Sequence, residues 1–217
     1  MNSILFDPKM KILALAPHTD DVELGCGGTL AKLKEAGAEL HVAAFSTASD
    51  SLPPGFPADT LKKEFLASTK TMGVPEDHTY VFDFQVRRLS YSRQEVLDEI
   101  IRLRKKIQPN LIFLPSPNDL HQDHQVVSSE GLRAFKEYSV LAYELPWNHI
   151  HFSAQAFVTL QEKHVQKKLE CLQQYKSQIF LERSYFKPEF VQSQCRMRGA
   201  QIKADFAEAF EVLRIRF

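Results

Sequence analysis

The chain has 217 residues, of which 44% are hydrophobic and 25% charged, a composition typical of folded globular proteins. Its 27 Lys and Arg balance 27 Asp and Glu, so the formal net charge is zero, which argues against a dedicated nucleic-acid-binding protein. No apolar run approaches the ~20 residues that a helix needs to span a bilayer. The length is sufficient for one domain with a sizeable buried core.

Short apolar runs alternate with longer helical patterns along the chain. Strands are expected at residues 11–16, 40–45, 80–84, 111–114, 140–145 and 156–160. Helices are expected at residues 28–36, 60–72, 93–107 and 160–175. Near-continuous apolar strands separated by helices indicate a parallel sheet covered on both faces. The sequence therefore predicts one α/β domain over residues 1–217, with a Rossmann-like, mostly parallel sheet and helices on both faces.

The cysteines and the N-terminus bear on the cellular compartment. Cys26, Cys171 and Cys195 are odd in number and lack C-x-x-C spacing, which argues against a disulfide framework or a cysteine zinc site. Residues 1–8 lack the basic stretch and the long apolar run of a signal peptide. We therefore expect a cytoplasmic protein.

Histidines and carboxylates gather in two segments, each directly after a predicted strand. Residues 17–28 read PHTDDVELGCGG, and residues 115–124 read PSPNDLHQDH. The carboxyl ends of parallel strands share one edge of a sheet, where ligands bind, so the two segments should meet there. Two imidazoles and a carboxylate are the ligand set of a catalytic zinc that keeps a position open for water. A second carboxylate beside that water would serve as general base.

Spacing alone leaves the roles within these segments open. Asp20 and Asp21 are adjacent and cannot point the same way, so one can take the metal while the other faces substrate. Of His121 and His124, one can bind the metal while the other acts on the reacting group, and Asp123 can orient an imidazole. Each pair taken alone is also typical of a helix cap or a surface turn. Their coincidence on matching strand ends favours the metal site.

Other candidate features have simpler interpretations. The run at residues 25–28 is not G-x-G-x-x-G, so it predicts close packing of a helix start against the sheet rather than a dinucleotide loop. Cys26 within it is expected to be a small buried residue. His41 and His78 have no clustered partners in the sequence and are expected to be structural.

The two segments resemble the motifs of the PIG-L/LmbE family of zinc-dependent de-N-acetylases. The family's A-H-P-D-D, often continued by V-E-I-G-x-G-G-T, is similar to PHTDDVELGCGGT at residues 17–29. Its H-P-D-H is similar to HQDH at residues 121–124. A weaker tail block follows, with YKSQ at 175–178, RG at 198–199 and FAEAF at 206–210, where relatives tend to read R-G and Y-A-E-A-F.

The resemblance implies a role for each motif residue. It implies three ligands for one Zn²⁺ per chain, or for Fe²⁺, which suits the same donors: His18, Asp21 and His124. It further implies Asp20 as general base, and His121, oriented by Asp123, as the group that stabilises the oxyanion or protonates the leaving amine. The implied reaction removes the acetyl group from an N-acetylated amino sugar of the N-acetylglucosamine type and releases acetate.

The sequence departs from the family pattern at several positions. Thr19 and Gln122 replace prolines, Lys62 stands near the place of an arginine in many relatives, Phe206 replaces a tyrosine and Lys203 a glycine. Neither proline supplies a metal ligand, and lysine is a poorer bidentate clamp than arginine. The departures therefore bear on substrate preference more than on metal chemistry.

Three residues are candidates for substrate contact: Lys62, Asp50 in a possible lid at residues 46–57, and Trp147, whose indole could stack on a sugar. A solvated loop for Asp50 and core packing for Trp147 are equally good interpretations. Two functional alternatives remain, a catalytically weak metal- or sugar-binding relative and an amidase for a larger amide conjugate. The expected partners are a small N-acetylated amino-sugar substrate and, from the family resemblance, further copies of the chain.

Overall fold

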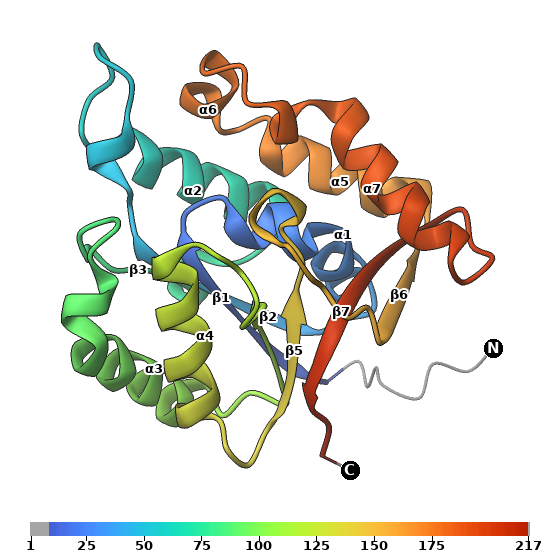
Figure 1. Ribbon diagram of the computed structural model, residues 1–217, viewed down its shortest axis with the longest axis horizontal. Coiled ribbons are helices and arrows are strands. Elements are labelled where there is room, and N and C mark those ends of the chain that lie inside the picture. Colours follow the sequence, from blue (N-terminus) through green and yellow to red (C-terminus); the bar gives the residue numbers. More distant parts are fainter. Residues whose placement is uncertain (1–8, 217) are drawn as a thin grey trace.

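The computed structural model describes residues 9–216, so the expectation for the N-terminal eight residues lies outside the described part. Within these residues, seven strands form one sheet in the order β3-β2-β1-β4-β5-β7-β6 (Figure 1). The strands are β1 (Lys11–His18), β2 (Glu39–Ser46), β3 (Thr79–Val81), β4 (Leu111–Pro115), β5 (Ser139–Tyr143), β6 (Ala156–Leu160) and β7 (Phe206–Arg214). The α-helices are α1 (Asp21–Glu35), α2 (Thr60–Met72), α3 (Arg93–Ile107), α4 (Gln122–Ala134), α5 (Glu162–Leu172), α6 (Lys176–Phe180) and α7 (Pro188–Ala200).

The sheet is parallel except for β7, which runs antiparallel to both of its neighbours, β5 and β6. This confirms the predicted single α/β domain with a mostly parallel sheet. The strand order reverses between β1 and β4, which is where an open α/β sheet forms a ligand-binding crevice at its carboxyl edge. No helix within residues 9–216 is long and apolar enough to cross a membrane.

Both faces of the sheet are buried. Ile12, Ala14 and Ala16 of β1 join one apolar cluster, while Leu13 and Leu15 join the other, as the two-residue alternation of a strand requires. The first cluster contains residues of α1, α2, α5 and α7, and the second contains residues of α3 and α4. The two groups of helices lie on opposite sides of the sheet (Figure 1). The predicted covering of both faces is therefore confirmed.

Helix α1 begins earlier than expected. It starts at Asp21 rather than at residue 28, and it is kinked at Cys26, whose φ of −145° and ψ of 19° are not helical. A Cβ on Gly25 would lie 2.2 Å from the ring of Tyr143, and one on Gly28 would lie 2.6 Å from Leu160. The glycine run thus allows the close packing of the helix against the sheet that the sequence predicted, and Cys26 is fully buried.

The C-terminal strand β7 was not predicted, because its buried glutamates break the apolar pattern. Glu208 accepts hydrogen bonds from the backbone N–H groups of Gly28 (3.0 Å) and Thr29 (2.6 Å), just beyond the kink of α1. It also pairs with Lys168 at 2.7 Å, and both side chains are at most 5% exposed. The glutamate of the tail block therefore caps the second half of α1.

The rest of the tail block is also structural. A Cβ on Gly199 would lie 2.6 Å from the carbonyl oxygen of Ala204, so the turn after α7 requires glycine there. Lys203, at the position where relatives tend to carry glycine, has a φ of +57°. Arg198 forms an ion pair with the buried Glu144 that follows β5.

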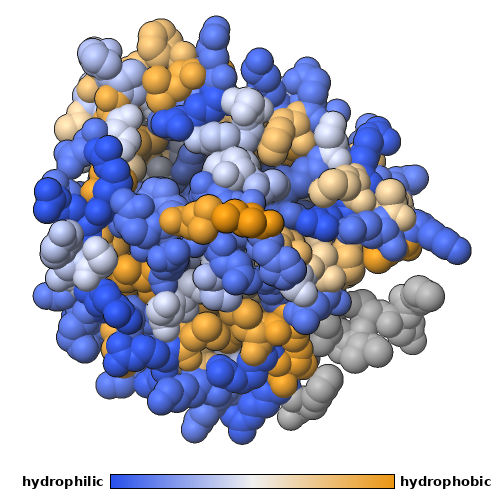
Figure 2. All heavy atoms as spheres, in the orientation of Figure 1, coloured by the Kyte–Doolittle hydropathy of each residue, from blue (hydrophilic) through white to orange (hydrophobic). Residues whose placement is uncertain are grey.

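Hydrophilic side chains predominate on the face seen in Figure 2, with the hydrophobic ones in separate patches.

Candidate active site

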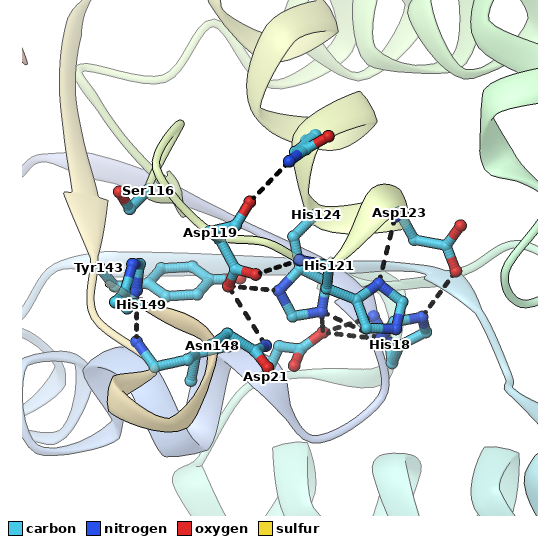
Figure 3. A network of polar contacts seen from close by, with 12 residues as sticks. His18, Asp21, Ser116, Asp119, His121, Asp123, His124, Tyr143, Asn148 and His149 are labelled. Carbon is cyan, nitrogen blue, oxygen red and sulfur yellow. Dashed lines mark hydrogen bonds and ion pairs between the residues drawn. The ribbon is translucent and has the colours of Figure 1, made fainter. Parts of the chain in front are cut away.

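The segments that follow β1 and β4 meet at the carboxyl edge of the sheet, as their sequences predicted. They border a cavity of about 320 Å³, lined by both motifs and by residues of the C-terminal third of the chain. The motif residues on its wall are His18, Thr19, Asp20, Asp21, His121 and His124. Figure 3 shows the three imidazoles and the Asp21 carboxylate converging.

Three potential ligand atoms form a nearly equilateral triangle. Nδ1 of His18 lies 3.2 Å from Oδ2 of Asp21 and 3.2 Å from Nε2 of His124, and this Nε2 lies 3.3 Å from the same Asp21 oxygen. Ligands about 2.0–2.1 Å from a tetrahedral zinc are separated by roughly 3.3–3.4 Å. The spacing of these atoms therefore fits three corners of a zinc coordination shell.

Each of the two imidazoles in the triangle is held by a buried carboxylate on its other nitrogen. Nε2 of His18 lies 3.0 Å from Oδ2 of Asp123, and Nδ1 of His124 lies 2.7 Å from Oδ2 of Asp119. When the rings are neutral and donate their N–H to these carboxylates, the lone pairs of His18 Nδ1 and His124 Nε2 lie on the side of Asp21. Such carboxylate–imidazole pairs orient metal-binding histidines and increase their basicity.

The expectation that Asp123 orients His121 is wrong in this structure. The Asp123 carboxylate bonds to His18 and accepts the backbone N–H groups of Arg87 (2.6 Å) and Leu89 (3.2 Å). The Asp123 backbone N–H instead donates to Nδ1 of His121 at 3.2 Å, so the His121 side chain caps α4. Its Nε2 then carries the proton of the neutral ring. Sequence could not reveal this, because one aspartate can reach either histidine.

His121 is also close enough to count as a fourth potential ligand. Its ring nitrogen and those of His18 and His124 all lie within 4.8 Å of one another. The 3.2 and 3.3 Å separations make Asp21 the tighter third member of the triangle. Two imidazoles with a carboxylate and three imidazoles are both ligand sets of catalytic zinc, so the shorter separations are what favour Asp21 over His121.

Burial and neighbouring charges shift the protonation of the cluster. Burial, then the charge of Asp21, raises the pKa of Asp20 to about 6. Burial opposes ionisation of Asp21 as well, but the charge of His124 and the hydrogen bond from His18 lower its pKa to about 2. Burial, with the charges of His124 and His18, lowers the pKa of His121 to about 4. The adjacent aspartates thus differ: the pKa of Asp21 lies below the usual value of an aspartate, and that of Asp20 lies above it.

His18 shows the opposite shift. Burial works against its protonation, but the hydrogen bonds with Asp123 and Asp21 raise its pKa to about 10. A proton on Nδ1 occupies the place that a metal would take between these partners. The side chains around His18 Nδ1 therefore favour a positive charge at this point, whether it is a proton or a metal ion.

The three expected substrate residues are not brought together. Trp147 lines the cavity, stacked on Tyr185 with ring centres 4.1 Å apart and an angle of 11°. Asp50 lies in a neighbouring hollow, where it accepts a hydrogen bond from Gln85 at 3.1 Å. Lys62 is exposed and borders another hollow. Of the three residues, Trp147 alone lines the cavity that contains the two motifs.

Sequence reasoning missed the cations and one carboxylate of the site. Arg87 and Arg183 both line the cavity, and the charge of Arg183 stabilises the ionised form of Asp20. Arg183 also donates to the hydroxyl of Tyr185 at 2.8 Å. Asp119 is fully buried behind His124. Asp119 lies in the second segment, two residues before His121. A carboxylate so close to the two histidines indicates a partner for one of their rings, which the structure shows to be His124.

The fold and the cluster together define a class of protein: an α/β domain with a carboxylate–imidazole cluster at the carboxyl edge of its sheet. Residues 13–135 match the PIG-L family, described as GlcNAc-PI de-N-acetylase. The chain belongs to this family, which confirms the resemblance stated from the motifs.

Two similar proteins extend the match beyond the family's shared segment. The chain is 28% identical over 171 residues to the uncharacterized deacetylase YaiS of Escherichia coli (strain K12), covering 76% of this chain and 90% of the relative. It is 29% identical over 137 residues to diacetylchitobiose deacetylase of Thermococcus kodakarensis, covering 59% of this chain and half (50%) of the relative.

Solved structures share the fold at low sequence identity. N,N'-diacetylchitobiose deacetylase from Pyrococcus horikoshii has a TM-score of 0.78 at 21% identity, covering 94% of this chain and 84% of its own. GalB, the 4-carboxy-2-hydroxymuconate hydratase of Pseudomonas putida KT2440, also has a TM-score of 0.78, at 18% identity, covering 96% of this chain and 98% of its own. The fold is therefore shared by a deacetylase and a hydratase, so the reaction has to be argued from the site.

Proposed function

We propose that the chain is a metal-dependent N-deacetylase that removes the acetyl group from an N-acetylated amino sugar or its conjugate and releases acetate. One observation carries the proposal: the triangle of His18, Asp21 and His124 ligand atoms, 3.2–3.3 Å on a side, with Asp20 beside it in the cavity. Membership of the PIG-L family and two relatives named as deacetylases support it.

The donor set fits one zinc ion per chain. Two imidazoles and one carboxylate leave a fourth position open, which is the arrangement of catalytic zinc. A bound zinc would supply a Lewis acid for the acetamide carbonyl and a water whose pKa is about 7. Fe²⁺ suits the same donors, so the proposal extends to either ion.

Asp20 acts as the general base. It lies at the start of α1, lines the cavity next to Asp21 and has a pKa raised to about 6 by burial and by the Asp21 charge. A carboxylate with this pKa is ionised at neutral pH and is basic enough to take a proton from the attacking water. Arg183 keeps the ionised form accessible.

His121 acts as a neutral hydrogen-bond donor. Its Nδ1 accepts the backbone N–H of Asp123, so the ring proton lies on Nε2. Nε2–H can donate to the oxygen that becomes negative when the acetamide carbonyl is attacked. Of the two roles that the family resemblance implied for His121, this favours stabilisation of the oxyanion over protonation of the leaving amine. The proton for the departing amine then comes from Asp20, which has just received one from the attacking water, while neutral His121 keeps its Nε2 proton and serves as a hydrogen-bond donor.

The cavity wall favours a carbohydrate. The stacked Trp147 and Tyr185 rings offer an apolar face of the kind on which sugar rings stack, and Arg87 and Arg183 add donors for hydroxyl groups. The substrate proposal is therefore an N-acetylglucosamine-type conjugate.

The domain and its cellular compartment also stay proposals. Residues 1–217 would form a single LmbE-like domain. A cytoplasmic location fits the three cysteines, which are all free and buried. Homo-oligomerisation stays a prediction.

The test is acetate release from a substrate panel. Apo protein, zinc-loaded protein and iron-loaded protein are assayed on N-acetylglucosamine, its conjugates and larger N-acyl analogues. We expect metal-dependent acetate release from an N-acetylated sugar, unchanged in Asp98→Asn, whose carboxylate is exposed on α3. Metal-loaded protein that releases no acetate would favour the weak binding relative. Activity confined to larger acyl groups would favour the amidase.

A further inference from the structure

A second group of metal-binding side chains lies at the opposite edge of the sheet. Glu39 and His41 are two residues apart in β2, so both point to the same face of the strand. His78 ends the 3₁₀ turn Glu76–His78 that leads into β3. One ligand atom from each of these residues lies within 4.8 Å of the others. The sequence expectation that His41 and His78 lack clustered partners is therefore wrong.

This cluster is separate from the proposed active site. His41 lies near the start of β2, whereas the His/Asp triangle lies at the carboxyl ends of β1 and β4. Ser46, at the carboxyl end of β2, is five positions after His41, which corresponds to roughly 17 Å along the strand. The cluster plays no part in the proposed reaction.

The contacts within the cluster hold its three side chains close together. The rings of His41 and His78 are stacked with centres 4.1 Å apart. Oε1 of Glu39 lies 2.7 Å from Nε2 of His41. Nδ1 of His78 is buried and has no hydrogen-bond partner. A buried ring nitrogen without a partner is costly, and a metal ion would satisfy it.

The second nitrogen of His41 is also supported. The hydroxyl of Tyr80 in β3 lies 3.4 Å from Nδ1 of His41. When Nε2 binds a cation, the ring proton resides on Nδ1, where it can donate to this hydroxyl.

Neighbouring charges permit a single divalent ion. The nearby cations are Lys11, with Nζ 3.9 Å from the Glu39 carboxylate, and Lys106, with Nζ 4.8 Å from the centre of the Tyr80 ring. The Lys11 side chain is 43% exposed and can move into solvent when Glu39 takes another partner.

From this placement we propose that Glu39, His41 and His78 bind a zinc-type divalent transition ion that fastens the edge strand β3 to β2. Two imidazoles and a carboxylate suit such an ion. The edge strand is the part that needs fastening, because β3 has only three residues and pairs with β2 at three positions. The ion would join the start of β2 directly to the turn before β3.

The test counts zinc ions per chain by native mass spectrometry, after zinc loading and exchange into buffer with a weak chelator. His78→Gln removes the proposed second ion, and His124→Gln removes the ion of the proposed active site. We expect two ions in wild type, one in each single variant and none in the double variant. His151→Gln, an exposed histidine outside the cluster, should keep two.

A thermal melt with and without zinc provides the second readout. Wild type and His124→Gln should gain melting temperature from the second site, whereas His78→Gln should lose this gain while its far-ultraviolet circular dichroism stays native. A wild-type zinc count that His78→Gln does not reduce would overturn the proposal. Failure of the active-site assignment would be visible separately, as an unchanged count in His124→Gln or the absence of acetate release.

Discussion

The two ends of the chain contribute differently to the site. Residues 11–135 supply every proposed ligand and catalytic group, and the carboxylates behind the ligand histidines, Asp119 and Asp123, come from the same part. Residues 136–214 supply the Trp147–Tyr185 wall, Arg183 and the buried Lys168–Glu208 pair under α1. Only residues 13–135 match the family description. The groups of the proposed reaction thus come from one part of the chain, whereas the C-terminal part supports them and supplies most of the proposed substrate wall.

The largest expected effect is on stability, from the buried Lys168–Glu208 pair under α1. Glu208→Gln leaves the Lys168 ammonium buried without its partner and weakens the cap on the second half of α1. We expect the free energy of unfolding to fall by about 3–5 kcal/mol, measured by urea denaturation. Glu162→Gln, exposed on α5, should change it by less than about 0.5 kcal/mol. Equal effects from both variants would contradict the role given to the pair.

Asp119, a carboxylate from the N-terminal part, should affect metal affinity rather than stability. Asp119→Asn keeps an oxygen for the His121 backbone N–H but removes the acceptor for Nδ1–H of His124. We expect zinc affinity at the proposed active site to fall by about 10–100-fold, measured by competition with a chromogenic chelator. Asp98→Asn should leave the affinity unchanged. An unchanged affinity in Asp119→Asn would show that this carboxylate does not support a metal ligand.

Substrate binding should report on the C-terminal wall. Trp147→Ala removes an apolar surface from the cavity without touching the ligand triangle. We expect KM for the N-acetylated sugar to rise by about fivefold, from a loss of roughly 1 kcal/mol, with kcat little changed. Trp147→Phe should recover most of the loss. A change confined to kcat would instead place Trp147 in the chemical step.

The smallest effect tests the turn after α7. Lys203 has a φ of +57°, which costs a residue with a side chain about 1–2 kcal/mol, whereas glycine adopts it freely. Glycine also loses more conformational entropy on folding, so Lys203→Gly should increase stability by a net ~0.5–1 kcal/mol. Lys187→Gly, at a φ of −68°, should bring no gain. Destabilisation by Lys203→Gly would show that its side chain matters more than its backbone.

The sequence predicted the architecture well where patterns are local. The strands that became β1, β2 and β4 are continuous apolar runs, and the motifs directly after β1 and β4 pointed to the correct edge of the sheet. The strand β7 escaped because Glu208 and Glu211 face buried partners rather than solvent. Alternation cannot reveal such a strand when its inward residues are charged.

Contacts between distant segments were beyond the sequence. His78 meets Glu39 and His41 only because the 3₁₀ turn before β3 brings it alongside the start of β2. Asp123 holds His18 rather than His121 because the Arg87 and Leu89 backbone fixes its carboxylate. Hydrophobic periodicity and motif spacing carry no information about contacts between distant segments. These pairings could therefore be found only from the three-dimensional structure.

The most direct test of the proposed mechanism compares zinc retention and acetate release in one variant. Asp20→Asn removes the proposed base and leaves the triangle of His18, Asp21 and His124 intact. The account predicts that this variant keeps the wild-type zinc count while kcat falls by about 10²–10⁴-fold. Full zinc retention with acetate release within about threefold of wild type would contradict the assignment of Asp20 as the base.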